Sequence, residues 1–178
     1  LGYDTPTIRR RVAEMASFFG IQEWFYKPVT ELSGGQKQLL NLASVMVLQP
    51  KVLILDEPTS QLDPIAASDF LATLGKINRE LGTTIILTEH RLEEAFGFAS
   101  RVAVMDNGRL LCTGTPAEVG AELKSSGNAM FLAMPAAMRI WAAADSTVAC
   151  PISVCDGRNW LLDYAKAHEL KPIPEETR

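Results

Sequence analysis

The chain lacks several features that would define its class at once. No apolar run approaches the ~18 to 20 residues that cross a bilayer, and the richest candidate, residues 129–144, is interrupted by Pro135 and Arg139. Its three cysteines lack the paired spacing of a zinc site, and we expect no secretory leader, so the thiols should be free in a reducing compartment. The net charge of −4 argues against a surface dominated by basic residues, and we expect no nucleic-acid partner.

What is present is an ordinary globular composition. With 178 residues, 47% of them hydrophobic and 21% charged, the chain is long enough for one core and a smaller appendage. It begins at Leu1 instead of Met and enters a helical pattern almost at once, so we expect a piece of a longer protein. Any membrane association should run through a partner or along a surface.

The most informative stretch is a short apolar run that ends in two carboxylates. Four aliphatic residues, 52–55, precede Asp56, Glu57 and Pro58. Such a run predicts a parallel strand buried on both faces. Open α/β sheets bind ligands at the carboxyl ends of their strands, so two acids there suggest a site that holds a cation and moves a proton. The simpler alternative is that both carboxylates only bond the turn that follows.

A second stretch offers a site for an anion. The run Leu-Ser-Gly-Gly-Gln at 32–36 stands in front of a helix predicted over 37–49. Ser33 brings a hydroxyl, and Gly34 and Gly35 leave backbone N–H groups unhindered at the positive end of the helix dipole. A phosphate would fit there. The alternative is an ordinary helix cap with glycines for a tight turn.

Further helix, strand and turn signals surround these two stretches. Thr5 and Pro6 predict the start of an amphipathic helix that Gly20 ends, and an apolar strand over 84–88 precedes His90. An Asn-Gly pair predicts a hairpin turn between strands 101–105 and 109–113. From residue 116 on, the pattern predicts short helices at 116–123, 135–143 and 158–169, then a loose tail from Lys171.

Taken in order, these stretches resemble the ATP-binding cassette (ABC) ATPases. The Ser-Gly-Gly-Gln run matches the family's signature motif, the run 60–63 matches its D-loop with Gln61 in place of the usual Ala, and His90 matches its switch histidine. The resemblance implies an α/β fold: part of a P-loop NTPase, with a mostly parallel sheet flanked by helices, part of the helical subdomain and a small C-terminal helical extension. It covers residues 1–120; residues 121–178 would be an extension or a connector between two cassettes.

The resemblance also implies roles for the site residues. Asp56 would support Mg²⁺ through water, Glu57 would be the base for the attacking water, and His90 would contact the γ-phosphate of ATP. In the family, the signature motif closes over ATP bound by a second cassette, which is arranged head to tail with the first. The matching residues here are Ser33, Gly34, Gly35 and Gln36. Asp63 would lie at the same dimer interface.

One motif of the family is missing. The 178 residues contain no G-x-x-x-x-G-K-[ST] loop, and the nearest pair, Gly75 and Lys76, lies in a helical pattern. We expect the loop to lie upstream of Leu1, and we expect the chain alone neither to bind ATP tightly nor to hydrolyse it.

The finer resemblance is to energy-coupling factor (ECF) importers of cobalt or vitamins. It rests on residues 37–43 and on the run Glu-His-Arg-Leu-Glu-Glu at 89–94. It implies transmembrane coupling and substrate-binding subunits as partners and a peripheral place on the cytoplasmic face of the cell membrane. Two alternatives stay open: a soluble ABC-type ATPase of DNA repair or chromosome maintenance, and a non-catalytic cassette used for subunit pairing.

Overall fold

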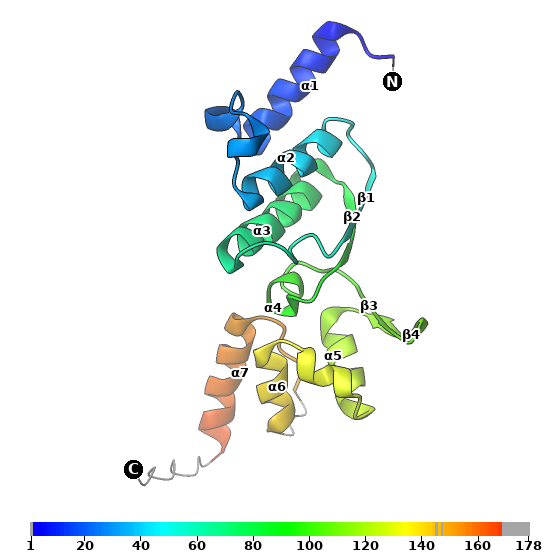
Figure 1. Ribbon diagram of the computed structural model, residues 1–178. Helices are drawn as coiled ribbons and strands as arrows, with labels where there is room; N and C mark the ends of the chain where they lie inside the picture. Colours follow the sequence, from blue (N-terminus) through cyan, green and yellow to red (C-terminus); the bar gives the residue numbers. More distant parts are fainter. Residues whose placement is uncertain (1, 145, 147, 169–178) are drawn as a thin grey trace. The chain divides into compact units, whose positions relative to one another are not determined.

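The protein forms two compact units along the chain, Leu1–His90 and Arg91–Arg178. The computed structural model describes residues 2–144, 146 and 148–168 (Figure 1). The expected division at residue 120 stays a prediction. None of the described helices combines the length and the apolar character needed to cross a membrane.

The N-terminal unit begins with helix α1 (Thr5–Phe18). Its cap is Asp4, whose carboxylate accepts the N–H of Thr7 at 3.1 Å, so the expected cap at Thr5 was one residue late. Aspartate caps a helix at least as well as threonine, which explains the shift. The helix ends before Gly20, as expected, and Gly20 takes a positive φ of 66°. Two 3-10 turns follow, η1 (Gln22–Trp24) and η2 (Val29–Glu31).

A two-stranded parallel sheet lies beside the helices of this unit. Strand β1 (Val52–Asp56) pairs with β2 (Thr84–Thr88) in a register that sets Asp56 opposite Thr88. Helices α2 (Gly34–Met46) and α3 (Pro64–Leu81) lie on one side of the strands (Figure 1). The crossover through α3 brings the carboxyl ends of both strands to the same edge.

The prediction that β1 is buried on both faces was wrong. Leu53 is buried toward the helices, whereas Val52 and Ile54 are 51% and 71% exposed, and Ile86 on β2 is 53% exposed. The reason is that α2 and α3 cover one face only, so among the described residues of this unit the other face of the sheet has no helix over it. Four consecutive aliphatic residues specify a strand but not what covers it.

Helix α3 contributes more buried hydrophobic residues to the unit's core than any other element. It buries one face, including Phe70, Leu71, Leu74 and Ile77, and Gly82 ends it in the left-handed conformation. Asp63 caps its first turn by accepting the N–H groups of Ile65 and Ala66, each at 3.0 Å. The cap and the glycine give α3 well-defined ends between β1 and β2.

The C-terminal unit is a hairpin followed by helices. A short helix, α4 (Leu92–Ala95), precedes strands β3 (Val102–Asp106) and β4 (Arg109–Gly114), which are antiparallel. Asn107 and Gly108 take positive φ values of 47° and 73°, which confirms the predicted Asn-Gly turn. Then come α5 (Pro116–Ser125), η3 (Ala129–Ala133), α6 (Ala136–Ala143) and α7 (Val154–Ala167).

Helix α7 begins four residues earlier than predicted. Ser153 and Asp156 form a reciprocal capping box in front of Val154, and this signal outweighs the glycine at 157. Trp160 and Tyr164 are half-buried, whereas Leu161 is 45% exposed. The helix ends at Ala167, two residues before the expected end at 169, and the tail from Lys171 lies outside the described residues.

Candidate functional site

The site lies where β1 and β2 end side by side. The hydroxyl of Thr88 donates a 2.5 Å hydrogen bond to Oδ1 of Asp56. The backbone N–H of Glu57 donates to both the carbonyl oxygen and the Oγ1 of Thr88, at 3.1 and 3.0 Å. Thr88 therefore links the backbone of one carboxylate residue to the side chain of the other.

Glu57 sits in a strained backbone conformation. Its φ is +42°, a left-handed value that a residue with a long side chain rarely adopts. Such strain costs about 1–3 kcal/mol and persists where surrounding bonds over-determine it. Here the Glu57 N–H donates to two oxygens of Thr88, and these bonds hold the backbone in this conformation.

Glu57 and His90 come into direct contact. Oε1 of Glu57 lies 2.9 Å from Nε2 of His90, although 33 residues separate them in the chain. The side chains are 48% and 83% exposed, so a pair of this kind adds little to stability, about 0–1 kcal/mol at most. Its value is geometric: a carboxylate and an imidazole share one open edge that water can reach.

The turn after Glu57 is held from both sides. Ser60 N–H donates to the carbonyl of Glu57 at 3.2 Å, and Leu62 N–H donates to that of Thr59 at 3.0 Å. From helix α2, the amide of Gln38 donates to the carbonyl of Pro58 at 3.1 Å. The start of α2 and the end of β1 are thus tied to each other.

Ser33 forms a full capping box at the start of α2. Its Oγ accepts the N–H of Gln36 at 3.2 Å, and its own N–H donates to Oε1 of Gln36 at 2.9 Å. Helix α2 therefore begins at Gly34, not at the predicted residue 37. Glycine is a poor helix former, but the reciprocal cap offsets that cost. This outcome agrees with the alternative of an ordinary cap and is equally compatible with an anion beside it.

The two glycines behind Ser33 have different surroundings. A Cβ on Gly35 would lie 3.1 Å from Cβ of Ala66 on α3, so Gly35 permits close packing of the two helices. A Cβ on Gly34 would meet nothing within 4 Å, so its backbone faces open space. Gly34 is therefore dispensable for packing in this chain, and its exposed side is where an anion or a partner could approach.

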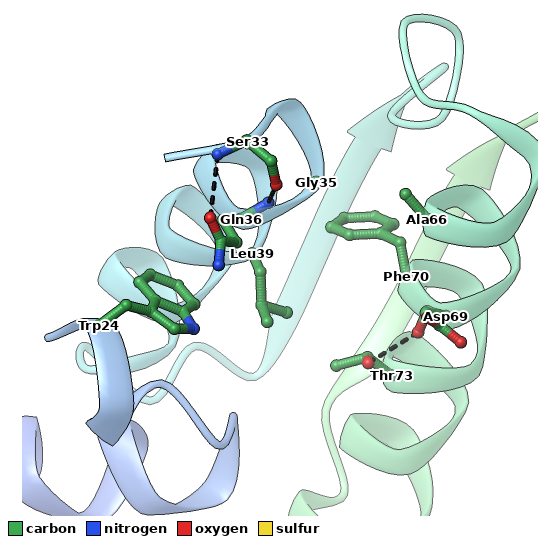
Figure 2. A pocket seen from close by; sticks show the side chains of 9 residues that line it. All are labelled: Trp24, Ser33, Gly35, Gln36, Leu39, Ala66, Asp69, Phe70 and Thr73. Atoms are coloured by element: carbon green, nitrogen blue, oxygen red, sulfur yellow. Dashed lines mark hydrogen bonds between the residues drawn. The ribbon is translucent and has the colours of Figure 1, made fainter. Parts of the chain in front are cut away.

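A groove of about 250 Å³ lies beside this helix start. Its walls come from η1, α2 and α3, and Figure 2 shows Phe70 projecting from α3 toward α2. Asp69 also lines it, and a carboxylate in the wall disfavours a phosphate. The groove is thus a poor place for the anion, and the open side of Gly34 suits it better.

The residues expected from the sequence fall into two groups. Asp56, Glu57 and His90 meet at the sheet edge, whereas residues 33–36 and Asp63 cap two neighbouring helices. Sequence analysis missed the three side chains that organise the first group: Thr59, Thr88 and Glu89. Only Thr88 carried a signal, because it ends the strand that pairs with β1.

The donor set at the sheet edge fits Mg²⁺ held through water. Among the described residues, no group of three or more His, Cys, Asp or Glu side chains could hold a metal ion. One carboxylate, Asp56, with a hydroxyl beside it suits an ion that keeps several waters and takes other ligands from substrate phosphates. A metal caged entirely by protein ligands does not fit this edge.

Solved structures define the class of fold. The structure of cbiO1 from Clostridium perfringens, described as part of the ABC transporter complex cbiONQ, matches with a TM-score of 0.64 and 35% identity. The match covers 82% of this chain and 57% of that one. The fold is therefore that of the ABC ATPases, a branch of the P-loop NTPases, as predicted.

Sequence relatives give the family. Residues 4–60 match the family described as ABC transporter. A Bacillus anthracis protein named as an ABC transporter ATP-binding protein is 54% identical over 123 residues, 69% of this chain. The energy-coupling factor transporter ATP-binding protein EcfA1 of Caldanaerobacter subterraneus is 41% identical over 124 residues, 70% of this chain and 44% of that protein. The chain carries part of an ABC transporter ATP-binding domain, and it spans 22% of the length of the Bacillus protein.

Proposed function

We propose that this chain supplies the magnesium and water side of an ATP site in an ABC transporter ATPase. The observation that carries the proposal is the 2.9 Å contact between Glu57 and His90, next to Asp56 at the carboxyl end of β1. A base, an orienting group and a metal-supporting carboxylate are three of the parts that phosphoryl transfer to water requires.

Each side chain has a task that its position suits. Bound Mg²⁺ would neutralise charge on the phosphates of ATP, and Asp56 would hold its water shell. Oε1 of Glu57 would accept the proton of the attacking water. His90 holds that carboxylate through Nε2 and would contact the γ-phosphate from the same side.

The signature segment serves a second cassette in this proposal. The space beside Gly34 is open, and there the backbone N–H groups at the start of α2 would bind a phosphate held by a partner cassette. Asp63 would lie at the same seam. Two cassettes arranged head to tail would then enclose two ATP molecules, and ATP binding would favour the closed pair.

The phosphate-binding loop is the part that these 178 residues do not contain. We therefore propose that the chain alone has no ATPase activity. A phosphate-release assay on the purified chain should give no turnover above background. Turnover that disappears in Glu57→Gln would contradict this part of the proposal.

An ECF-type importer is the finer assignment that we propose. It is supported by the similarity to EcfA1 and to cbiO1, each named as part of a transporter. The partners would be transmembrane coupling and substrate-binding subunits, the cargo a vitamin or metal ion, and the place the cytoplasmic face of the membrane. Co-purification of the full-length protein with such membrane subunits tests this assignment against a DNA-repair ATPase, which would purify without them.

The catalytic test uses Glu57→Gln in the full-length protein. Loss of a general base lowers turnover by roughly 10²–10⁴-fold, and solute uptake should fall with it. Glu80→Gln is the matched control, because Glu80 is an exposed acid at the end of α3, away from the carboxyl ends of β1 and β2 where the site lies. Uptake that is unchanged in Glu57→Gln would instead favour a non-catalytic cassette that only pairs subunits.

A further inference from the structure

A buried hydroxyl lies directly behind the candidate base. Thr59 is fully buried two residues after Glu57, and its Oγ1 donates a 2.6 Å hydrogen bond to Oε2 of Glu89. A buried hydroxyl needs a partner, and no other bond of this side chain is recorded among the described residues. The bond therefore fixes Glu89 against the turn.

The second oxygen of the same carboxylate holds the histidine. Oε1 of Glu89 accepts the backbone N–H of His90 at 2.9 Å. One side chain thus anchors both the turn that follows Glu57 and the backbone of the residue whose imidazole contacts Glu57. Bonds to an ionised acceptor are the stronger kind, which suits a role in fixing geometry.

The contact between Glu57 and His90 needs such an anchor. Both side chains are substantially exposed, so packing does not hold them at 2.9 Å. Their relative position must come from the backbones that carry them. Thr88 sets the backbone of Glu57, as described above, and Glu89 is the link between the following turn and His90.

We propose that Glu89 is a positioning residue for the Glu57–His90 pair. The inference rests on the proposed function, since the pair has a catalytic task only if the site hydrolyses ATP. Glu89 does not touch the reacting atoms. It acts by holding the His90 backbone at a fixed distance from the Thr59 turn.

The geometric arm of the test uses the 178-residue chain without nucleotide. The chain has two histidines, so labelling with ¹⁵N-histidine gives two backbone amide signals, from His90 and His168. Glu89→Ala should shift the His90 signal and speed its hydrogen exchange, while His168 in the other unit stays unchanged. An unchanged His90 amide in a folded Glu89→Ala chain would overturn the proposal without reference to activity.

The kinetic arm uses the full-length ATPase. Glu89→Ala should lower kcat by roughly 10–100-fold with little change in KM, since supporting bonds and small misplacements have effects of this size. Glu89→Gln should recover most of kcat: its amide can accept from His90 N–H and donate to Thr59, whose hydroxyl can also accept. Thr59→Val combined with Glu89→Ala should be no worse than Glu89→Ala alone, because both remove one link.

The outcomes separate this inference from the proposed function. If Glu57→Gln abolishes turnover but Glu89→Ala leaves kcat unchanged, the positioning role is wrong and the ATP site stands. If Glu57→Gln has no effect, the proposed function itself is wrong. If Glu89→Ala lowers the melting temperature as well as kcat, its low kcat could come from lost stability, and Glu89→Gln is the deciding variant. A Glu89→Gln protein that is stable but has a kcat as low as that of Glu89→Ala would overturn positioning by hydrogen bonds.

Discussion

Replacing Ser33 separates its capping role from its proposed contact with phosphate. Ser33→Ala removes the bond from Gln36 N–H to Oγ, and removal of a cap costs about 0.5–2 kcal/mol. Because the bond is 3.2 Å long and exposed, we expect the loss of folding stability to lie in the lower half of that range, at about 0.5–1 kcal/mol. For a unit of this size that is a fall in melting temperature of roughly 2–8 °C.

Ser33→Asp is the informative partner of that variant. Aspartate caps as well as serine, and its charge adds about 0.3–1 kcal/mol at a helix N-terminus, so stability should hold or rise. In the full-length ATPase the same carboxylate would repel the phosphate proposed to lie there, and turnover should collapse. Thermal unfolding by circular dichroism and phosphate release measure the two effects. A Ser33→Asp protein as unstable as Ser33→Ala would refute the cap, and one with full turnover would refute the anion site.

Two further expectations follow from surroundings that the structure shows. Gly34→Ala should raise the melting temperature slightly, because alanine is the better helix former and its Cβ would meet nothing within 4 Å. Gly35→Ala should be less stable than Gly34→Ala by about 1 kcal/mol, because its new Cβ lies 3.1 Å from that of Ala66; equal melting temperatures would contradict this packing. Burial raises the pKa of Cys150 from 9.0 to about 11, so at pH 8 it should be alkylated roughly 100-fold more slowly than an ordinary thiol, while the exposed Cys155 reacts readily by mass spectrometry. In the unfolded chain the Cys150 thiol has the ordinary pKa of 9.0, so it loses its proton at lower pH than in the folded chain, where the pKa is about 11. The C-terminal unit should therefore lose stability as pH rises from 9 to 11.

Local signals in the sequence were enough to predict the hairpin turn and the end of β1. The Asn-Gly pair at 107–108 specifies its own hairpin, because it supplies two residues that tolerate positive φ. The two acids at the end of β1 pointed to the sheet edge because an apolar run that stops abruptly fixes where a strand stops. In both cases the controlling interaction lies within a few residues.

The rest of the site depends on contacts between distant residues. Nothing in the local pattern says that Glu89 meets Thr59, 30 positions away, or that Thr88 bonds both acids. The exposed face of β1 was also beyond prediction, because burial depends on which elements cover a strand and not on its own letters. The early start of α7 is different: its capping box was legible at 153 and 156 and was overlooked.

The left-handed backbone at Glu57 sets thermostability and chemistry against each other at a single position. Glycine would adopt φ of +42° without strain, so any search for more heat-resistant variants would favour it there. That replacement would discard the carboxylate that we propose accepts a proton from the attacking water. If Glu57 has the proposed role, keeping glutamate at this position holds the protein below its attainable stability, and the cost lies in a single backbone torsion angle.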